Sequence, residues 1–241
     1  MPKVPAKDAK RSRSTLLFVL VGAAAFVAAA ALIAVSLSGG SSSKSPSPSE
    51  PLTGVGDALS VFGGIPQHGI TVGNPKAPVT IVEYADLQCP YCAHFATDEL
   101  PGVVQEDVRT GKAKIEYRGL AFIGPDSLNG LRTAFAAGEQ GKLWQFVDIL
   151  FANQGAENSG WLSDSLLRRV GEAVPGLDVD KMFADRGGAR VTALVQSASA
   201  SAQTAGVNST PTLFVGPTGG TLTQVSSATA SAVEQAVAAA S

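Results

Sequence analysis

A pattern typical of a buried strand leads directly into the two cysteines of the chain. Val79 to Ala85 is almost continuously apolar and rich in β-branched residues, as expected of a central parallel strand buried on both faces. After Cys92, apolar residues recur at helical spacing as far as Gly111. Cys89 and Cys92 therefore lie where a strand turns into a helix, which predicts an α/β fold built around this junction.

The spacing of the cysteines favours redox chemistry. They are the only two in 241 residues. A disulfide between them would close a very short loop, so a purely structural bond would gain little entropy. A zinc site needs about four ligands, and neither His68 nor His94 belongs to a second pair of ligands. A redox-active pair is the favoured interpretation, and no metal site is expected.

The four residues Cys-Pro-Tyr-Cys are expected to have different tasks. Cys89 is predicted to begin the helix, where unpaired N–H groups and the helix dipole favour a thiolate and lower its pKa. Pro90 suits the first helical position, because that N–H has no partner within the helix. Tyr91 is interpreted as a tuning residue at an exposed tip. Cys92 is expected to be more buried and to resolve the mixed disulfide formed by Cys89.

The N-terminal segment predicts an exported, membrane-anchored protein. Residues 1–14 carry five basic residues and one acidic residue, and residues 15–37 contain an uncharged apolar run. About 22 residues at about 1.5 Å per residue span a hydrocarbon core of about 30 Å. The basic flank is expected to stay in the cytoplasm and the remainder to lie outside. A cleaved signal peptide is the alternative, although its apolar region would be shorter, about 7–15 residues.

The rest of the chain predicts a tether and one domain. Residues 38–61 are rich in Ser, Gly and Pro, which is typical of a flexible linker. Residues 62–241 are enough for one domain with a substantial core. Without residues 1–14, 13 of the 18 basic and 19 of the 20 acidic residues remain, a net charge of −6. An acidic exported domain is a poor candidate for binding nucleic acid.

The segment EYADLQCPYCAHF, Glu83 to Phe95, resembles the active-site segment of DsbA-like thiol–disulfide oxidoreductases, particularly the membrane-tethered bacterial ones. The resemblance covers most of residues 73–216. Its further segments are 108–122, 137–154, 160–163, 176–182 and AGVNSTPTLFVG at 205–216. It implies a thioredoxin fold with a helical insertion at about 126–190. Apolar stripes at 143–151, 162–170 and 191–205 independently predict helices.

The resemblance also implies roles for residues outside the cysteine pair. Pro211 would follow a cis bond and lie against the cysteines, so that the backbone of Thr210 could pair with an extended substrate peptide. Alternatively, Pro211 only starts the next strand. Glu83 would have a raised pKa and relay a proton for Cys92, or it would bind water at the end of the sheet. His94, when protonated, would lower the pKa of Cys89, or it would only face solvent.

The activity implied by the resemblance is dithiol–disulfide exchange with exported proteins that contain cysteines. Introduction of disulfides is favoured, and no external cofactor is expected because the cysteine pair is the reactive group. An oxidase must be re-oxidised, which implies a quinone-linked membrane partner. The alternatives are a reductase or disulfide isomerase of the same fold, and a peptide-binding or chaperone module in which the cysteine pair is incidental.

Overall fold

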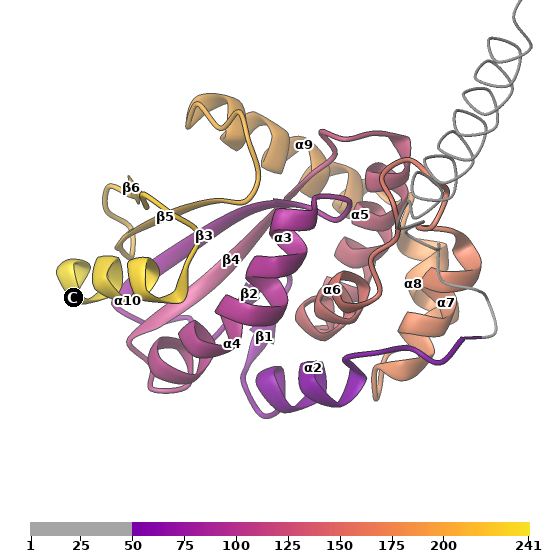
Figure 1. Ribbon diagram of the computed structural model, residues 1–241, viewed down its shortest axis with the longest axis horizontal. Coiled ribbons are helices and arrows are strands. Elements are labelled where there is room, and N and C mark those ends of the chain that lie inside the picture. Colours follow the sequence, from indigo (N-terminus) through magenta and orange to yellow (C-terminus); the bar gives the residue numbers. More distant parts are fainter. Residues whose placement is uncertain (1–49) are drawn as a thin grey trace, which may run out of the picture. The chain divides into compact units, whose positions relative to one another are not determined.

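The structure is a computed structural model that describes residues 50–241, and a six-stranded mixed sheet forms its centre (Figure 1). The strand order is β1-β2-β4-β3-β5-β6. Strands β3 and β4 are parallel, and the other neighbouring pairs are antiparallel. The strands are β1 (Gln67–His68), β2 (Thr71–Val72), β3 (Val79–Asp86), β4 (Ala113–Leu120), β5 (Thr212–Pro217) and β6 (Thr223–Gln224).

Strand β3 is the central strand that the apolar run predicted. All eight of its residues are buried, because β4 and β5 flank it and helices cover both of its faces. Its register places Glu83 opposite Tyr117 of β4 and opposite Leu213 of β5. Ile81, Glu83 and Ala85 therefore share one face, since side chains alternate along a strand.

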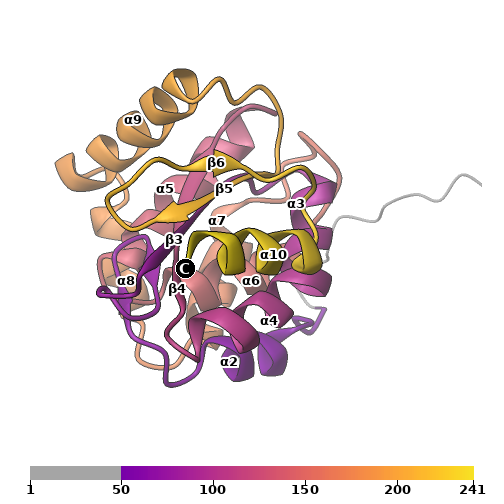
Figure 2. The same ribbon diagram turned by 90° about the vertical axis from the view of Figure 1, so that its left-hand side faces the viewer.

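The helix that follows the cysteines covers the Glu83 face of the sheet. It is continuous but irregular: α3 (Pro90–His94), the π-helical turn η1 (Phe95–Glu99), α4 (Leu100–Val103) and the π-helical turn η2 (Val104–Val108). Pro101 has no N–H to donate to the preceding turn, and the wider turn η1 lies directly before it. Helix α10 (Ala230–Ala240) packs beside α4 against β5 (Figure 2).

Helix α9 (Ala189–Thr204) lies on the opposite face of the sheet (Figures 1 and 2). Tyr84, whose side chain points away from the Glu83 face, donates its hydroxyl to Ser201 of α9 at 3.2 Å. Tyr84 also makes an edge-on contact with Phe214 of β5, with ring centroids 5.9 Å apart. The central sheet is thus enclosed between helices, which removes both of its faces from water.

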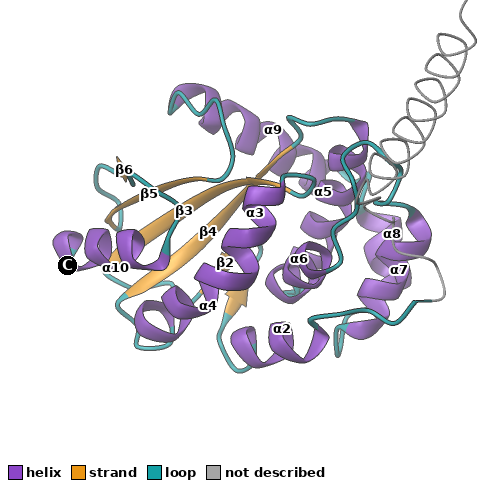
Figure 3. Cartoon of the chain, in the orientation of Figure 1, coloured by secondary structure: helices purple, strands orange, loops and turns teal. Residues whose placement is uncertain are grey.

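The predicted helical insertion is present between β4 and α9 (Figure 3). Its helices are α5 (Pro125–Gly138), α6 (Leu143–Ala152), α7 (Asp164–Ala173) and α8 (Val179–Asp185). The three apolar stripes correspond to α6, α7 and α9, which confirms those predictions. Two of the insertion helices have a side-chain N-cap. The Ser163 hydroxyl accepts from the N–H of Leu166, and the Asp178 carboxylate accepts from the N–H of Lys181.

The prediction that residues 38–61 form a flexible linker is wrong at its C-terminal end. Residues Val55–Phe62 form helix α2, which packs against α6. Ala58 and Phe62 are buried, and the Phe62 ring lies 5.6 Å from the Trp144 ring. Four-residue spacing places both side chains on one helical face. The folded domain therefore begins by Val55 and not at residue 62.

The predicted cytoplasmic segment 1–14, the membrane anchor 15–37 and the first part of the linker lie outside the described residues. Within residues 50–241, no helix combines the length and apolar character that crossing a membrane requires.

Replacing Phe62 with Ala is expected to destabilise the domain by about 3 kcal/mol or more, because a large side chain is lost from the core. Urea unfolding measures the change. The matched control is Ser60→Ala, an exposed residue in the same helix, which is expected to leave stability unchanged. Equal stability of Phe62→Ala and the wild type would contradict the assignment of α2 to the core.

Candidate active site

The two cysteines lie at the start of the first helical turn after β3. Cys89 has an extended backbone and precedes α3, and Pro90 occupies the first helical position. The Cys89 thiol donates to the carbonyl oxygen of Thr210 at 3.2 Å, and the Thr210–Pro211 bond is cis. Cys89 is 6% exposed, less than its position at a helix start predicts, because Thr210 lies against it. Cys92 is completely buried.

The two thiols differ strongly in acidity. The pKa of Cys89 is lowered from 9.0 to about 6, first by a hydrogen bond from the Cys92 thiol. Burial opposes this shift, while the Thr210 side chain and the N–H groups of Cys92 and Tyr91 reinforce it. The pKa of Cys92 is raised, first by burial and then by its hydrogen bond to Cys89. The pair therefore contains one thiol that ionises readily at neutral pH and one that remains protonated.

Two large hydrophobic side chains are exposed in the described part of the chain. Tyr91, which lies between the two cysteines in sequence, is 74% exposed, and Phe122, two residues after the end of β4, is 51% exposed. The sequence predicted the exposed Tyr91 but not Phe122. His94 forms a 2.6 Å contact with Asp98, one turn further along, and both side chains are more than half exposed. The His94 ring is thus paired with Asp98 at the helix surface, while the groups that lower the Cys89 pKa are Cys92, Thr210 and Tyr91.

Glu83 lies in the interior beneath the helix that carries the cysteines. It is 1% exposed, and its Oε2 atom has no hydrogen-bond partner. Burial, followed by repulsion from Asp148 of α6, raises the pKa of Glu83 to about 8. Burial, followed by repulsion from Asp57, raises the pKa of Asp148 to about 7. Both carboxyl groups can therefore be protonated near neutral pH.

Glu83 and Asp148 line one small cavity. Its volume is about 10 Å³, and Ala96 and Trp144 are among its other walls. The Trp144 indole N–H also has no partner. This volume is close to the smallest that holds one water molecule. The Glu83 found in the structure is thus an interior acid and not a residue at a solvated end of the sheet.

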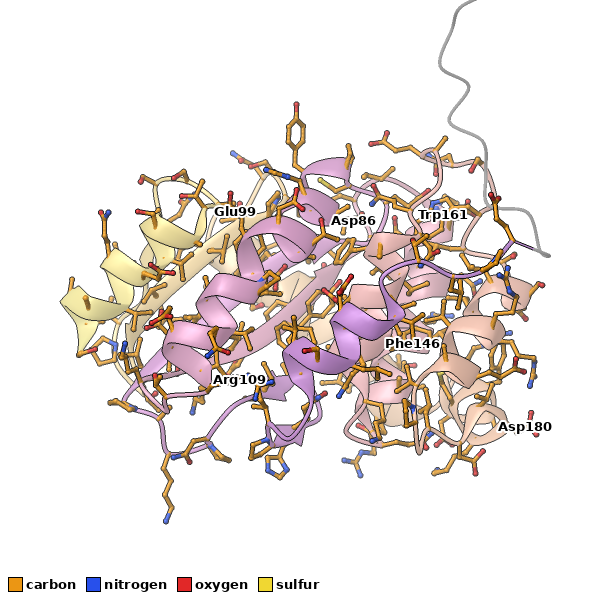
Figure 4. All side chains as sticks on the ribbon, turned by 60° about the horizontal axis from the view of Figure 1, so that its bottom comes forward. Asp86, Glu99, Arg109, Phe146, Trp161 and Asp180 are labelled. Atoms are coloured by element: carbon orange, nitrogen blue, oxygen red, sulfur yellow. The ribbon has the colours of Figure 1, made fainter. Side chains whose placement is uncertain are left out.

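Asp86 was not predicted from the sequence, although it organises the site. It is completely buried at the end of β3, between the active-site helix and the loops that lead into the insertion (Figure 4). Its carboxylate accepts from the N–H groups of Phe122 and Ile123 at 2.7 and 3.0 Å. It also accepts from the N–H of Gln88 at 2.9 Å and from the Ser127 hydroxyl at 2.6 Å. The sequence did contain a signal for Asp86, because it is an acidic residue at the end of a buried strand, three residues before Cys89.

Gln88 links the same junction to the insertion. Its side-chain amide donates to the Ser127 hydroxyl at 2.9 Å, and its carbonyl accepts from the N–H of Asn158 at 2.7 Å. The Asn158 side chain donates in turn to the carbonyl of Ile123 at 3.2 Å. Loop residues such as Gln88 and Asn158 follow no periodic pattern, so the sequence offered no signal for these contacts.

The described part of the chain contains no cluster of three or more His, Cys, Asp or Glu side chains that could hold a metal ion.

Comparison with known proteins relates this site to a family. The thioredoxin family model matches residues 66–233. Over 148 residues the chain is 31% identical to the probable disulfide bond formation protein D of Bacillus cereus, a match that covers 60% of this chain and 68% of that protein.

Solved structures show the same relationship. A thioredoxin-like oxidoreductase from Silicibacter pomeroyi is 32% identical, with a TM-score of 0.57 over 76% of this chain and 96% of that chain. Oxidised BdbD from Bacillus subtilis has a TM-score of 0.63 over 73% of this chain and 95% of that chain. Its identity is 20%, so this likeness supports the fold alone.

The raised pKa of Glu83 predicts a pH-dependent stability. The folded protein binds a proton more tightly than the unfolded chain, so the free energy of unfolding should fall as pH rises from 4.5 to about 8. Glu83→Gln should reduce this slope by up to about 1.4 kcal/mol per pH unit, and Asp148 should account for part of what remains.

Urea unfolding at half-unit pH intervals tests this prediction. The control is Glu172→Gln, which removes an exposed carboxyl group on α7 and should leave the slope unchanged. An identical slope in the wild type and in Glu83→Gln would show that the Glu83 carboxyl does not titrate in this range.

Proposed function

The chain belongs to the thioredoxin family and is a DsbA-like thiol–disulfide oxidoreductase, and we propose that it introduces disulfide bonds into exported proteins through Cys89 and Cys92. The observation that carries this proposal is the difference in acidity between the two thiols. A stable Cys89 thiolate exists only in the reduced protein, because the disulfide has no charge. Lowering the pKa of Cys89 therefore favours the reduced protein and makes its disulfide more oxidising.

The proposed reaction begins with the Cys89–Cys92 disulfide. A substrate thiolate attacks the Cys89 sulfur, a mixed disulfide forms, and Cys92 leaves with the electron pair of the broken bond. A second substrate thiolate then attacks the substrate sulfur of the mixed disulfide, and Cys89 leaves as a thiolate. The substrate gains a disulfide and the enzyme gains two electrons. Cys89 suits this role because a thiol with a pKa of about 6 is a good leaving group at neutral pH.

Cys92 needs a proton when it leaves, since burial strongly disfavours its thiolate. Glu83 is the proposed source. With a pKa of about 8 it is mostly protonated at neutral pH, and its cavity lies next to the helical turn that follows Cys92. Burial raises the pKa of Tyr117, and the charges of Glu83 and Cys92 raise it further, which supports a common location for these groups. Glu83 would recover its proton when the enzyme is re-oxidised.

The substrate is proposed to bind as an extended peptide beside Thr210 and Pro211. Strand β5 begins directly after this pair, and a backbone carbonyl next to Cys89 can accept a hydrogen bond from a passing chain. The exposed side chain of Tyr91, which lies between the two cysteines in sequence, is the proposed apolar contact for the substrate, and exposed Phe122 in the loop after β4 is a further candidate. Recognition of backbone and apolar groups tolerates many sequences, which suits an enzyme for varied exported proteins.

The proposed location is the outer face of a cytoplasmic membrane, with residues 15–37 as the anchor and the N-terminus inside. The charge asymmetry of residues 1–14 supports this orientation. Each cycle leaves a dithiol that must be re-oxidised, so a quinone-linked membrane protein is the proposed electron acceptor. Tyr91 and His94 are further candidates for tuning the potential.

The direction of the reaction can be tested by thermal unfolding. The reduced protein is expected to melt at a higher temperature than the oxidised protein, the reverse of a structural disulfide. The stability advantage should grow from pH 6 to pH 9 by up to about 1.4 kcal/mol per pH unit, because only the folded protein holds the Cys89 thiolate in this range. The reduction potential should lie above the roughly −270 mV of thioredoxin.

Calorimetry of both forms at several pH values and equilibration with glutathione provide these measurements. An oxidised form that melts higher at every pH, together with a potential below that of thioredoxin, would favour a reductase instead.

The division of labour between the thiols predicts opposite behaviour of two variants. Cys92→Ser should accumulate mixed disulfides, because its Cys89 thiolate can still attack a disulfide of another protein and no Cys92 thiol is left to displace that protein again. Cys89→Ser should accumulate none, because the remaining thiol is completely buried. Non-reducing electrophoresis after expression with exported proteins detects the complexes. Trapping by Cys89→Ser alone would reverse the assignment.

A further inference from the structure

The insertion contacts the backbone of the nucleophile through one side chain. Gln154 lies just beyond the end of α6, and its Nε2 atom donates to the carbonyl of Leu87 at 2.8 Å and to the carbonyl of Cys89 at 3.1 Å. A side-chain amide has two N–H donors, so both are used here. Gln154 therefore joins two backbone carbonyls of the turn between β3 and the active-site helix.

The Cys89 carbonyl is also the first acceptor of that helix. It accepts from the N–H groups of Cys92 and Ala93, both at 3.1 Å. The N–H groups of Tyr91 and Cys92 belong to the same turn and help to lower the pKa of Cys89. Because all these groups form one turn, a shift of the Cys89 carbonyl would also move the N–H groups relative to the sulfur.

The chain around Gln154 makes its own contacts within the insertion. The backbone N–H of Gln154 donates to the carbonyl of Phe151 at 3.2 Å. At the next residue, Gly155, an added Cβ would lie 2.6 Å from the Cβ of Trp161, so the chain packs there with no room for a side chain. On the far side of the turn, Asn158 donates its N–H to Gln88.

We propose that Gln154 is a positioning residue through which the helical insertion holds Cys89 in its reactive geometry. This inference rests on the proposed function of Cys89. It gives the insertion a part in setting the reactivity of the nucleophile. Because Gln154 carries no charge, it would affect Cys89 through its hydrogen bonds to the backbone and not through the electrostatic attraction of a charged group.

The surrounding ionisable groups allow this effect to be separated from direct electrostatics. Cys92 of the helix contacts Cys89 directly. Asp86 of β3 is engaged by Gln88, Ser127, Phe122 and Ile123. His94 pairs with Asp98 on the helix surface. A neutral substitution of Gln154 leaves all these groups unchanged.

The test uses Gln154→Met, which keeps most of the bulk but has no donors, and Gln154→Glu, whose carboxylate would face two carbonyl oxygens. Gln140 offers a matched control, since its amide donates to the carbonyl of Asp178 at 3.0 Å and accepts from the Asp178 N–H at 2.9 Å, within the same insertion. Gln140→Met and Gln140→Glu therefore remove similar hydrogen bonds away from the cysteines.

Thiolate absorbance against pH measures the Cys89 pKa, and equilibration with glutathione measures the potential. Gln154→Met is expected to raise the Cys89 pKa by about one unit, a tenfold change in the ionisation constant, and Gln154→Glu is expected to raise it further. A tenfold stabilisation lost from the reduced form corresponds to about 30 mV towards more reducing values. Both Gln140 variants should keep the wild-type pKa and potential.

Urea unfolding of all four variants keeps the test decisive. If Gln154→Met loses only as much stability as Gln140→Met and keeps the wild-type pKa and potential, the positioning role is overturned while the proposed function stands. If Gln154→Met does not fold, the same comparison is made with Gln154→Glu at a pH where it folds. A Cys89 pKa near 9 in the wild type would instead overturn the proposed function itself.

Discussion

The buried carboxylate of Asp86 is the interaction on which the architecture of the site depends. A charge in the interior is costly unless hydrogen bonds replace its water. Asp86 obtains four of them, from Gln88, Phe122, Ile123 and Ser127. These donors come from the active-site turn, the loop after β4 and the first helix of the insertion. One carboxylate thus fixes three separate stretches of chain around the cysteine pair.

The buried acids beneath the helix that follows the cysteines differ from Asp86 in their hydrogen bonding. Glu83 and Asp148 are acids with few hydrogen bonds, and their pKa values are raised so that each can be neutral near pH 7. The Asp86 carboxylate accepts four hydrogen bonds that join neighbouring segments, whereas one carboxyl oxygen of Glu83 has no hydrogen-bond partner. Glu83 also lines the small cavity. Two acids on the same strand, three residues apart, therefore have different surroundings.

Much of the fold could be predicted from local patterns, since these patterns report burial. The apolar run 79–85 became the central strand, and the stripes around Leu143, Leu166 and Val191 became helices. Helix α2 was missed because it follows a long stretch rich in Ser, Gly and Pro, and two turns of helix give a weak periodic signal. In the candidate site, the cysteines, Glu83 and the Thr210–Pro211 pair were identified from a recognisable motif. Asp86, Gln88, Asp148 and Gln154 were not, because their partners are far away in sequence and only the tertiary fold brings them together.

The two edges of the sheet are formed by very short strands, which limits how other polypeptide chains can pair with them. The edge strands β1 and β6 are each only two residues long, and they consist of polar residues. So short an edge offers an incoming strand very few hydrogen bonds, which protects a sheet from aggregation by edge-to-edge pairing. Extended, partly folded polypeptides are the kind of molecule that would otherwise add to such an edge. A sheet whose edge strands are this short and polar is a poor seed for the accumulation of such polypeptides.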